Sequence, residues 1–284
     1  MTVTGNGKNT TGRPASISLL EEKAHWVWRE TLKIHKTAQG TRLASSLSCI
    51  EIFVALYYGG IIAYDEKDIH WNHRDRFIVS KSHGAVSLYP ILADLGYFPM
   101  EELDRVCKQG GLLNDIPDST IPGFETVNGS LGHGLGVACG ISTALKMRNQ
   151  EEKVFVLSGD GELYEGSVWE AVMFAAHNGL GNLVLIIDNN KMSMLGYCKD
   201  ILDLEPLDGK LRAFGWKTKV VDGHDMGQLH RALRTFKKDG TDRPKALIAN
   251  TVKGRGIARL EADPLCHIKA VKGDEIDTLL GEIR

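Results

Sequence analysis

Two groups of oxygen-bearing side chains follow apolar runs that have the character of buried strands. The run 154–157 leads into Ser-Gly-Asp-Gly-Glu at 158–162, and the run 183–187 leads into Asp-Asn-Asn at 188–190. Carboxylate, amide and carbonyl oxygens are the ligands that Mg²⁺ prefers, and the ion commonly keeps phosphate oxygens in its shell. Gly161 lets backbone N–H groups approach a phosphate at the start of the following helix. The two groups therefore predict a magnesium diphosphate site, although an isolated Gly-Asp-Gly is also an ordinary turn.

Strand-like and helix-like patterns alternate along the chain, which predicts an α/β fold with a parallel sheet covered by helices on both faces. The predicted strands are 76–80, 154–157, 183–187, 218–221 and 246–248. The predicted helices are 17–37, 48–58, 163–178, 205–214 and 225–237, the first starting near Ser18, Glu21 and Glu22. Ligands bind at the carboxyl ends of parallel strands, where a third polar group at 80–83 also falls.

Composition limits the classes of partner. With 284 residues, 43% of them apolar, the chain can build a sizeable core, and 34 basic against 36 acidic side chains give no field for nucleic acid or an anionic membrane. Five cysteines without a CxxC pair favour a reducing cytoplasm. No run approaches the ~20 apolar residues of a membrane span. We expect a mobile tail at 1–14 without an export signal, and one domain at 15–284.

The surroundings of these groups resemble a known family. The stretch with Gly-Asp-Gly-Glu-Leu at 159–163, Gly166, Trp-Glu-Ala at 169–171 and Asp-Asn-Asn at 188–190 is similar to the thiamine diphosphate motif of transketolases. Further similar segments are NHRDRFIVSKSHGAVSLYPILADLGYFP at 72–99, Gly-Ser-Leu-Gly at 129–132, and Thr-Val-Lys-Gly-Arg-Gly-Ile at 251–257 with His267. The chain as a whole resembles the N-terminal subunit of a split transketolase, which implies the thiamine diphosphate-binding fold.

The resemblance also implies site residues. The metal, Mg²⁺ with Ca²⁺ or Mn²⁺ as alternatives, would be bound by Asp160, Asn190 and the Met192 carbonyl. The cofactor would contact Gly129, Ser130, Leu131, Gly159, Gly161, Glu162 and His83. The implied catalytic residues are His83, His267 and Glu165, the last of which matches a family glutamate that links paired active sites across a dimer.

The implied reaction moves a two-carbon ketol or acyl unit from a ketose phosphate, pyruvate or a related donor to an aldehyde. In the family a second domain supplies a glutamate to the aminopyrimidine ring of the cofactor. This chain matches the first domain alone, so we expect a C-terminal transketolase-like partner, an α2β2 assembly and no activity without that partner. Two alternatives are a 2-oxo acid dehydrogenase component that passes its acyl group to a lipoyl domain, and a cofactor-binding remnant without activity.

Two positions depart from the family pattern. Arg42 takes the place of a histidine in the family's Gly-His-x-Gly-Ser-x-Leu-Ser stretch, and Ile116 takes the place of a second histidine that holds the donor's terminal hydroxyl. Both are candidate substrate-binding residues. An isoleucine suits a methyl group, which favours an acetyl-like unit, whereas a shifted loop would let Asn114 or Asp115 contact the hydroxyl instead. Arg42 either binds a carboxylate or phosphate or is a solvated surface arginine.

A dinucleotide-binding site is the main rival. Glycines 134, 136 and 140, followed by a strand that ends near Asp160, imitate its fingerprint. The preceding segment, 121–128, contains Pro122 and Gly123 and lacks the buried strand that such a fingerprint requires. Close packing of a helix on the sheet is a more economical reason for these glycines.

Overall fold

A five-stranded parallel sheet forms the centre of the protein. The computed structural model describes residues 15–65, 67–127 and 129–282, so the predicted tail 1–14 lies outside the described residues. The strand order is β1-β2-β3-β5-β4, and every neighbouring pair is parallel. The strands are β1 (Arg76–Val79), β2 (Val154–Gly159), β3 (Leu183–Asn189), β4 (Lys217–Asp222) and β5 (Lys245–Asn250). All five predicted strands are confirmed.

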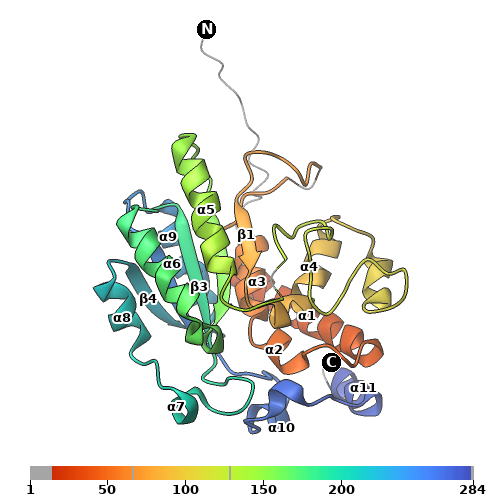
Figure 1. Cartoon of the computed structure of the whole chain (residues 1–284). Helices are drawn as coiled ribbons and strands as arrows, with labels where there is room; N and C mark the ends of the chain where they lie inside the picture. Colours follow the sequence, from red (N-terminus) through yellow and green to blue (C-terminus); the bar gives the residue numbers. More distant parts are fainter. Residues whose placement is uncertain (1–14, 66, 128, 283–284) are drawn as a thin grey trace.

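Alternate residues of each central strand enter two separate cores. In β2, Phe155 and Leu157 join one cluster of buried side chains, while Val154 and Val156 join the other. The helices α1, α3 and α9 contribute to the first cluster, and α5, α6 and α8 to the second (Figure 1). Since successive strand side chains point to opposite faces, a strand buried on both faces reads as an uninterrupted apolar run. The predicted sheet with helices on both faces is confirmed.

The helices connect the strands and extend over the carboxyl edge of the sheet. The α-helices are α1 (Ile17–Thr37), α2 (Leu43–Leu47), α3 (Ile50–Tyr57), α4 (Tyr89–Asp94), α5 (Gly134–Met147), α6 (Gly166–His177), α7 (Cys198–Ile201), α8 (Leu207–Ala213), α9 (Met226–Lys238), α10 (Ala258–Glu261) and α11 (Gly273–Glu282). Short 3₁₀ helices are η1 (Ser82–Leu88), η2 (Met100–Arg105), η3 (Asp160–Tyr164) and η4 (Cys266–Ile268).

Several predicted boundaries differ from those observed. The helix α1 has the predicted bounds 17–37, but its N-cap is Ser16, whose hydroxyl accepts from the N–H of Leu19 at 3.2 Å, so the choice of Ser18 as the start signal is wrong. The predicted helix 48–58 corresponds to α3, preceded by a separate short helix, α2. The strands β2 and β3 each continue two residues past their predicted ends, because the ladder pairs Gly159 with Asp188.

The start of α5 explains one of the three glycines of the imitated dinucleotide fingerprint. A Cβ at Gly134 would lie 2.3 Å from Oγ of Ser80, so the helix approaches the end of β1 closely only because this residue is glycine. Gly136 and Gly140 face open space, so for them the close-packing interpretation is wrong. No strand occurs among the described residues of 121–133, so the dinucleotide interpretation lacks the strand it requires.

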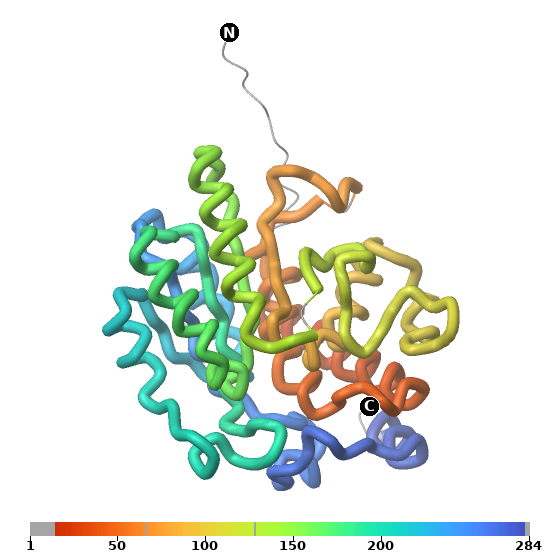
Figure 2. The backbone as a smooth tube through the Cα atoms, viewed as in Figure 1, coloured from red at the N-terminus to blue at the C-terminus, as the bar shows by residue number. Residues whose placement is uncertain are grey.

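Segments far apart in the sequence meet at the carboxyl edge of the sheet. The chain after β5 runs along this edge and brings η4 against α2 (Figure 2). Oγ of Ser45 in α2 lies 3.1 Å from Nδ1 of His267 in η4. The polar groups predicted at the strand ends therefore face one shared region.

Within the described ranges, no helix is both long and apolar enough to span a membrane.

Candidate cofactor and active site

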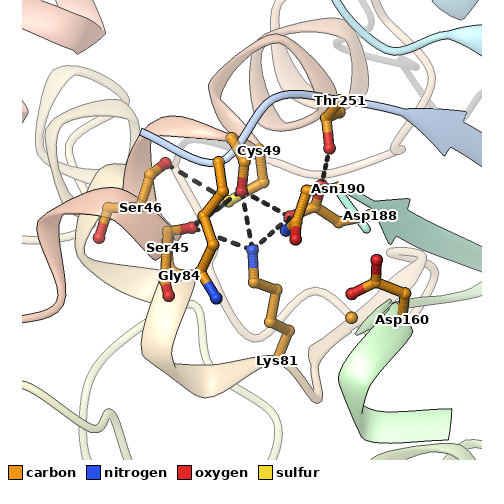
Figure 3. Close-up of polar contacts among 12 residues, drawn as sticks. Ser45, Ser46, Cys49, Lys81, Gly84, Asp160, Asp188, Asn190 and Thr251 are labelled. Carbon is orange, nitrogen blue, oxygen red and sulfur yellow. Dashed lines mark hydrogen bonds and ion pairs between the residues drawn. The ribbon is translucent and has the colours of Figure 1, made fainter. Parts of the chain in front are cut away.

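A buried ion pair joins the ends of β1 and β3. Lys81, the second residue after β1, is 7% exposed, and Asp188 in β3 is fully buried. The ammonium group of Lys81 pairs with Oδ2 of Asp188, and Figure 3 shows the two side chains pointing toward each other. The same ammonium group donates to the Ser45 carbonyl at 3.0 Å and contacts Oγ of Ser48 at 2.9 Å. The pair thus also anchors α2.

The remaining oxygen of Asp188 is used as well. The hydroxyl of Thr251, just past β5, donates to Oδ1, and that of Ser48 donates to Oδ2 at 2.6 Å. Burial alone raises the pKa of Asp188, but the charge and hydrogen bonds of Lys81 outweigh it, and the net pKa lies below the usual value. Burial likewise lowers the pKa of Lys81, and Asp188 reverses this to a net rise. Both groups are therefore charged at neutral pH, as a satisfied buried pair requires.

The predicted metal ligands lie together beside this pair. Asp160 and Asn190 are each 6% exposed, and Asp160 accepts from the N–H groups of Gly161 at 2.8 Å and of Lys191. Oδ1 of Asn190 accepts from the Met192 N–H at 3.1 Å. Lys191 has φ +63°, and this left-handed turn brings the Met192 carbonyl to the site. A carboxylate, an amide and a carbonyl form a hard oxygen donor set that suits Mg²⁺.

The predicted metal ligands would need anionic oxygens from a bound group to complete a coordination shell. No three His, Cys, Asp or Glu side chains form a metal-binding group among residues 15–65, 67–127 and 129–282. Asp160 thus contributes one carboxylate, and burial together with the nearby Asp188 charge raises its pKa to about 6. A metal diphosphate would supply both the positive charge that favours ionised Asp160 and the missing oxygen ligands.

Lys253 adds a second buried cation that the sequence did not single out. Its ammonium group donates to the carbonyls of Met192 at 3.1 Å and Ser193 at 2.9 Å, and the residue is 4% exposed. Burial and the charge of Lys81 lower its pKa to about 8. Two lysines thus concentrate positive charge around the donor set, where a diphosphate would need it.

An open cavity of about 320 Å³ connects the donor set to two histidines. It is lined by these predicted residues: His83, Leu131, Gly159, Asp160, Gly161, Glu162, Asn190, Met192 and His267. The rings of His83 and His267 are 5.5 Å apart. Burial lowers the pKa of both, that of His267 to about 3 with the help of Lys253. At neutral pH both imidazoles are uncharged, so each has one N–H donor and one nitrogen acceptor.

Glu162 lines the cavity, but its carboxylate is occupied by the protein. It accepts from the Ser80 hydroxyl, from the Gly132 N–H at 2.9 Å and from the Gly159 N–H at 3.3 Å. Burial raises its pKa, and these hydrogen bonds oppose the rise. Through these hydrogen bonds Glu162 links the end of β1, the segment 129–132 and the end of β2.

Five predicted residues do not line the cavity. Glu165 precedes α6 and is exposed, and Gly129 and Ser130 are exposed in the segment before Leu131. A Cβ at Gly129 would lie 3.4 Å from Cγ2 of Ile116, which places Ile116 behind this segment. Arg42 is the N-cap residue of α2 and is partly buried near His83.

Some cavity residues were not predicted as site residues. They are Ser45, Lys81, Tyr164, Ser193, Met194, Leu195, Ile201 and Lys253. For Lys81 and Lys253 the sequence offered a signal that could have marked them as site residues, because each lies in a segment that resembles the family. Their burial, seen in the structure, adds a second reason, since a lysine is rarely fully buried without a partner. The loop residues after Met192 had none, since their approach to the cavity depends on the turn at Lys191.

A family model and several relatives agree with this geometry. The family described as "Transketolase, thiamine diphosphate binding domain" matches residues 12–282. A subunit of the apulose-4-phosphate transketolase of Actinobacillus succinogenes is 39% identical over 271 residues, covering 95% of this chain and 97% of that protein. The "6-deoxy-6-sulfo-D-fructose transketolase subunit SqwG" of Clostridium sp. is 36% identical, covering 87% of this chain and 90% of that protein.

Solved structures show the same fold within longer chains. A transketolase from Campylobacter jejuni superposes with a TM-score of 0.87 at 27% identity, covering 94% of this chain and 43% of that chain. The fold and the site define a thiamine diphosphate-binding protein. The chain belongs to the transketolase family, as a subunit that carries the cofactor-binding domain of a two-carbon transferase and acts with a partner subunit. These findings give no support to the 2-oxo acid dehydrogenase alternative.

Replacement of Lys81 by methionine should destabilise the protein strongly, because it leaves the Asp188 carboxylate buried without its counter-charge. We expect a loss of about 3–5 kcal/mol in the free energy of unfolding. Urea unfolding of the purified chain measures it. The matched control, Lys199→Met on the exposed surface of α7, should change stability by less than about 0.5 kcal/mol. Equal stability of Lys81→Met and Lys199→Met would contradict the role of the pair.

Cofactor binding with magnesium should release a proton below neutral pH. Asp160 has a raised pKa of about 6 and must be ionised to bind a metal, so affinity should fall as the pH drops through 6, by about tenfold per pH unit at lower pH. Calorimetry in two buffers of different ionisation enthalpy measures the proton release. Binding that is independent of pH between 5 and 7 would show that Asp160 is not a ligand.

Proposed function

We propose that the cavity binds thiamine diphosphate through a divalent metal, most suitably Mg²⁺, held by Asp160, Asn190 and the Met192 carbonyl. The observation that carries the proposal is that this oxygen donor set shares one cavity with two buried lysines and two uncharged histidines. Ca²⁺ and Mn²⁺ have compatible ligand preferences. Gly159 and Gly161 leave room beside the donor set for the diphosphate.

When bound, the cofactor supplies the carbanion chemistry that breaks and forms the carbon–carbon bond. Leu131 gives an apolar contact for its ring system, with Gly129 and Ser130 in the same segment. His83 and His267 hydrogen-bond the hydroxyl and carbonyl oxygens of the substrates, since each uncharged imidazole has one N–H donor and one nitrogen acceptor. Glu162 holds the segment 129–132 in position rather than reacting.

The donor is a ketose phosphate, pyruvate or a related compound, and the acceptor is an aldehyde. Two relatives are named for apulose 4-phosphate and 6-deoxy-6-sulfofructose, both of which carry a strong anionic group. Arg42 lies near His83 and could bind such a group bidentately. Ile116 would form an apolar wall behind Gly129. These two assignments concern substrate binding and not the reaction itself.

The partner would be a C-terminal transketolase-like subunit that supplies the aminopyrimidine glutamate. Exposed apolar side chains beside the open cavity support its docking there: Met194, Leu195, Ile201, Leu202, Leu265 and Ile268.

Further apolar side chains are exposed on α5 and α6, and they support pairing of two such units near Glu165: Val137, Met147, Met173 and Phe174. We infer an α2β2 assembly in the cytoplasm, in which residues 15–284 form one domain.

Replacement of Asp160 by alanine should weaken binding of thiamine diphosphate severely in the presence of magnesium, by about a hundredfold or more, because the only carboxylate of the donor set is lost. Calorimetry on the chain assembled with its partner measures the affinity. Asp208→Ala on α8, a carboxylate outside the cavity, is the matched control. Unchanged affinity of Asp160→Ala would remove the cofactor assignment.

The chain without its partner should show negligible turnover, since a cofactor whose aminopyrimidine lacks a glutamate partner is not activated. Addition of the partner subunit should restore two-carbon transfer in a coupled assay with a ketose phosphate donor. The control is the partner alone, which should also be inactive. Full activity of this chain by itself would overturn the split arrangement.

A further inference from the structure

A second cavity lies beside the segment that follows β5. It is bounded by α1, by the junction of α2 and α3, by the start of α9 and by residues 255–256, and its lining includes Trp28, Glu51 and Met226. Its volume is about 610 Å³, against about 320 Å³ for the cavity around Asp160, and the two cavities have no lining residue in common. A cavity of this size takes a small organic molecule.

Much of the lining of the second cavity is apolar and fixed in position. Four of the lining side chains are at most 7% exposed: Ala24, Leu47, Ile50 and Met226. Trp28 adds an aromatic ring, and its indole N–H donates to the Arg255 carbonyl at 3.0 Å. A Cβ at Gly256 would lie 2.9 Å from the same nitrogen, so the backbone packs directly against the ring. A ligand therefore has little ordering of these surfaces to induce.

Glu51 brings a carboxylate without a counter-charge to this lining. Its Oε1 contacts Nδ1 of His224 at 3.0 Å, and Nε2 of His224 accepts from the Val252 N–H at 2.9 Å. Because Nε2 acts as an acceptor, Nδ1 carries the single proton of an uncharged imidazole. Oε2 of Glu51 is enclosed without a donor, and no lysine or arginine pairs with this carboxylate in the part of the chain that the structure describes.

These features favour a positively charged organic group. The Glu51 side chain is 18% exposed, and Glu21, two turns before Trp28 on the same face of α1, adds a second carboxylate to the lining. A metal ion fits poorly, since no three His, Cys, Asp or Glu side chains form a metal-binding group within the described ranges. An ammonium group supplies the missing counter-charge and can donate to the free lone pair of Glu51 Oε1. An apolar body on the same molecule covers the apolar lining and packs on Trp28, whose ring face attracts cations.

The segment 251–256 connects this cavity to the proposed cofactor site. The side chain of Thr251 donates to the buried ion pair, and that of Lys253 donates to the backbone carbonyl of the predicted metal site. The backbone of Val252 and Arg255 instead bonds to two side chains that line the second cavity. A ligand that orders this segment from one cavity therefore reduces the ordering that a ligand in the other has to supply.

We propose that the second cavity is a regulatory site for a small organic ammonium ion with an apolar body, coupled to cofactor binding through the segment 251–256. The binding of the ammonium ion is independent of the function proposed above, whereas the coupling rests on it. Because coupling is reciprocal, the ammonium ion and thiamine diphosphate strengthen each other's binding by the same factor. Two sources offer this chemistry: a free amine, and an amino acid whose carboxylate reaches the exposed Arg255.

Calorimetry on the chain assembled with its partner subunit tests the site with 2-phenylethylamine as the probe. We expect one molecule bound per chain with a dissociation constant below about 1 mM. The control ligand is 3-phenylpropionate, which has the same ring and spacer with a carboxylate in place of the ammonium group and should bind at least about tenfold more weakly. L-phenylalanine separates the two sources. Tighter binding that Arg255→Gln removes identifies an amino acid, and equal or weaker binding identifies a free amine.

Glu51→Gln keeps the size of the side chain and an oxygen for His224, and it should weaken binding of the amine about tenfold or more. Ala24→Leu places a larger side chain in the cavity and should weaken binding as well. The matched control is Glu22→Gln, on α1 but outside the lining, which should leave the affinity unchanged. Thermal unfolding of every variant separates a loss of binding from a loss of folding.

Thiamine diphosphate with magnesium should raise the affinity for the amine about fivefold or more. No saturable binding of the amine, equal binding of 3-phenylpropionate, or unchanged affinity in folded Glu51→Gln would overturn the site. Equal affinity for the amine with and without the cofactor would overturn the coupling and leave the site. Failure of the wild type to bind thiamine diphosphate would instead remove the function proposed above, while saturable binding of the amine would still support the second site.

Discussion

The structure of the site depends on the buried pair between Lys81 and Asp188. Four segments that are distant in sequence converge on it: the end of β1, β3, the helix α2 through Ser48, and the start of the chain after β5 through Thr251. Both carboxylate oxygens and the ammonium group have partners there, which is the condition under which a buried ion pair is tolerated. Figure 3 shows Asn190 and Asp160 beside this pair, and His83 and Lys253 line the same cavity.

The charged groups of the cavity act on one another. Asp160 lies near the Asp188 charge, which helps to raise its pKa and makes the donor set receptive to a cation. Burial and the charges of Lys81 and Lys253 keep His83 and His267 uncharged, so that each imidazole has one N–H donor and one nitrogen acceptor. The same two lysines thus favour an anion in the cavity and keep its histidines neutral.

The cavity is open to the surface of the described chain. Apolar side chains of the loop after Met192 and of η4 remain exposed beside it, and the cavity residues of this chain include no glutamate other than Glu162, whose carboxylate is already occupied within the described structure. Longer transketolases contain the matching fold in about two fifths of their length, with 43% in the Campylobacter jejuni protein. In the arrangement proposed here, docking of the partner subunit over the open cavity would exclude water from the reaction.

The sequence by itself determined the sheet, because strands buried on both faces are uninterrupted apolar runs, and it determined that Asp160 and Asn190 lie at the ends of two such strands, because each follows directly after an apolar run and its polar end. The sequence pointed to Ser18 instead of Ser16 as the residue that starts α1, and to close packing at Gly136 and Gly140, since capping and packing depend on neighbours that local patterns do not reveal. Only the tertiary structure decided that Lys81 pairs with Asp188 and Lys253 with the Met192 carbonyl, across separations of 107 and 61 residues. It also decided that Glu162 ties segments together and that Glu51 keeps an unpaired oxygen, because hydrogen-bond satisfaction is set by which groups meet in space and not by their order along the chain.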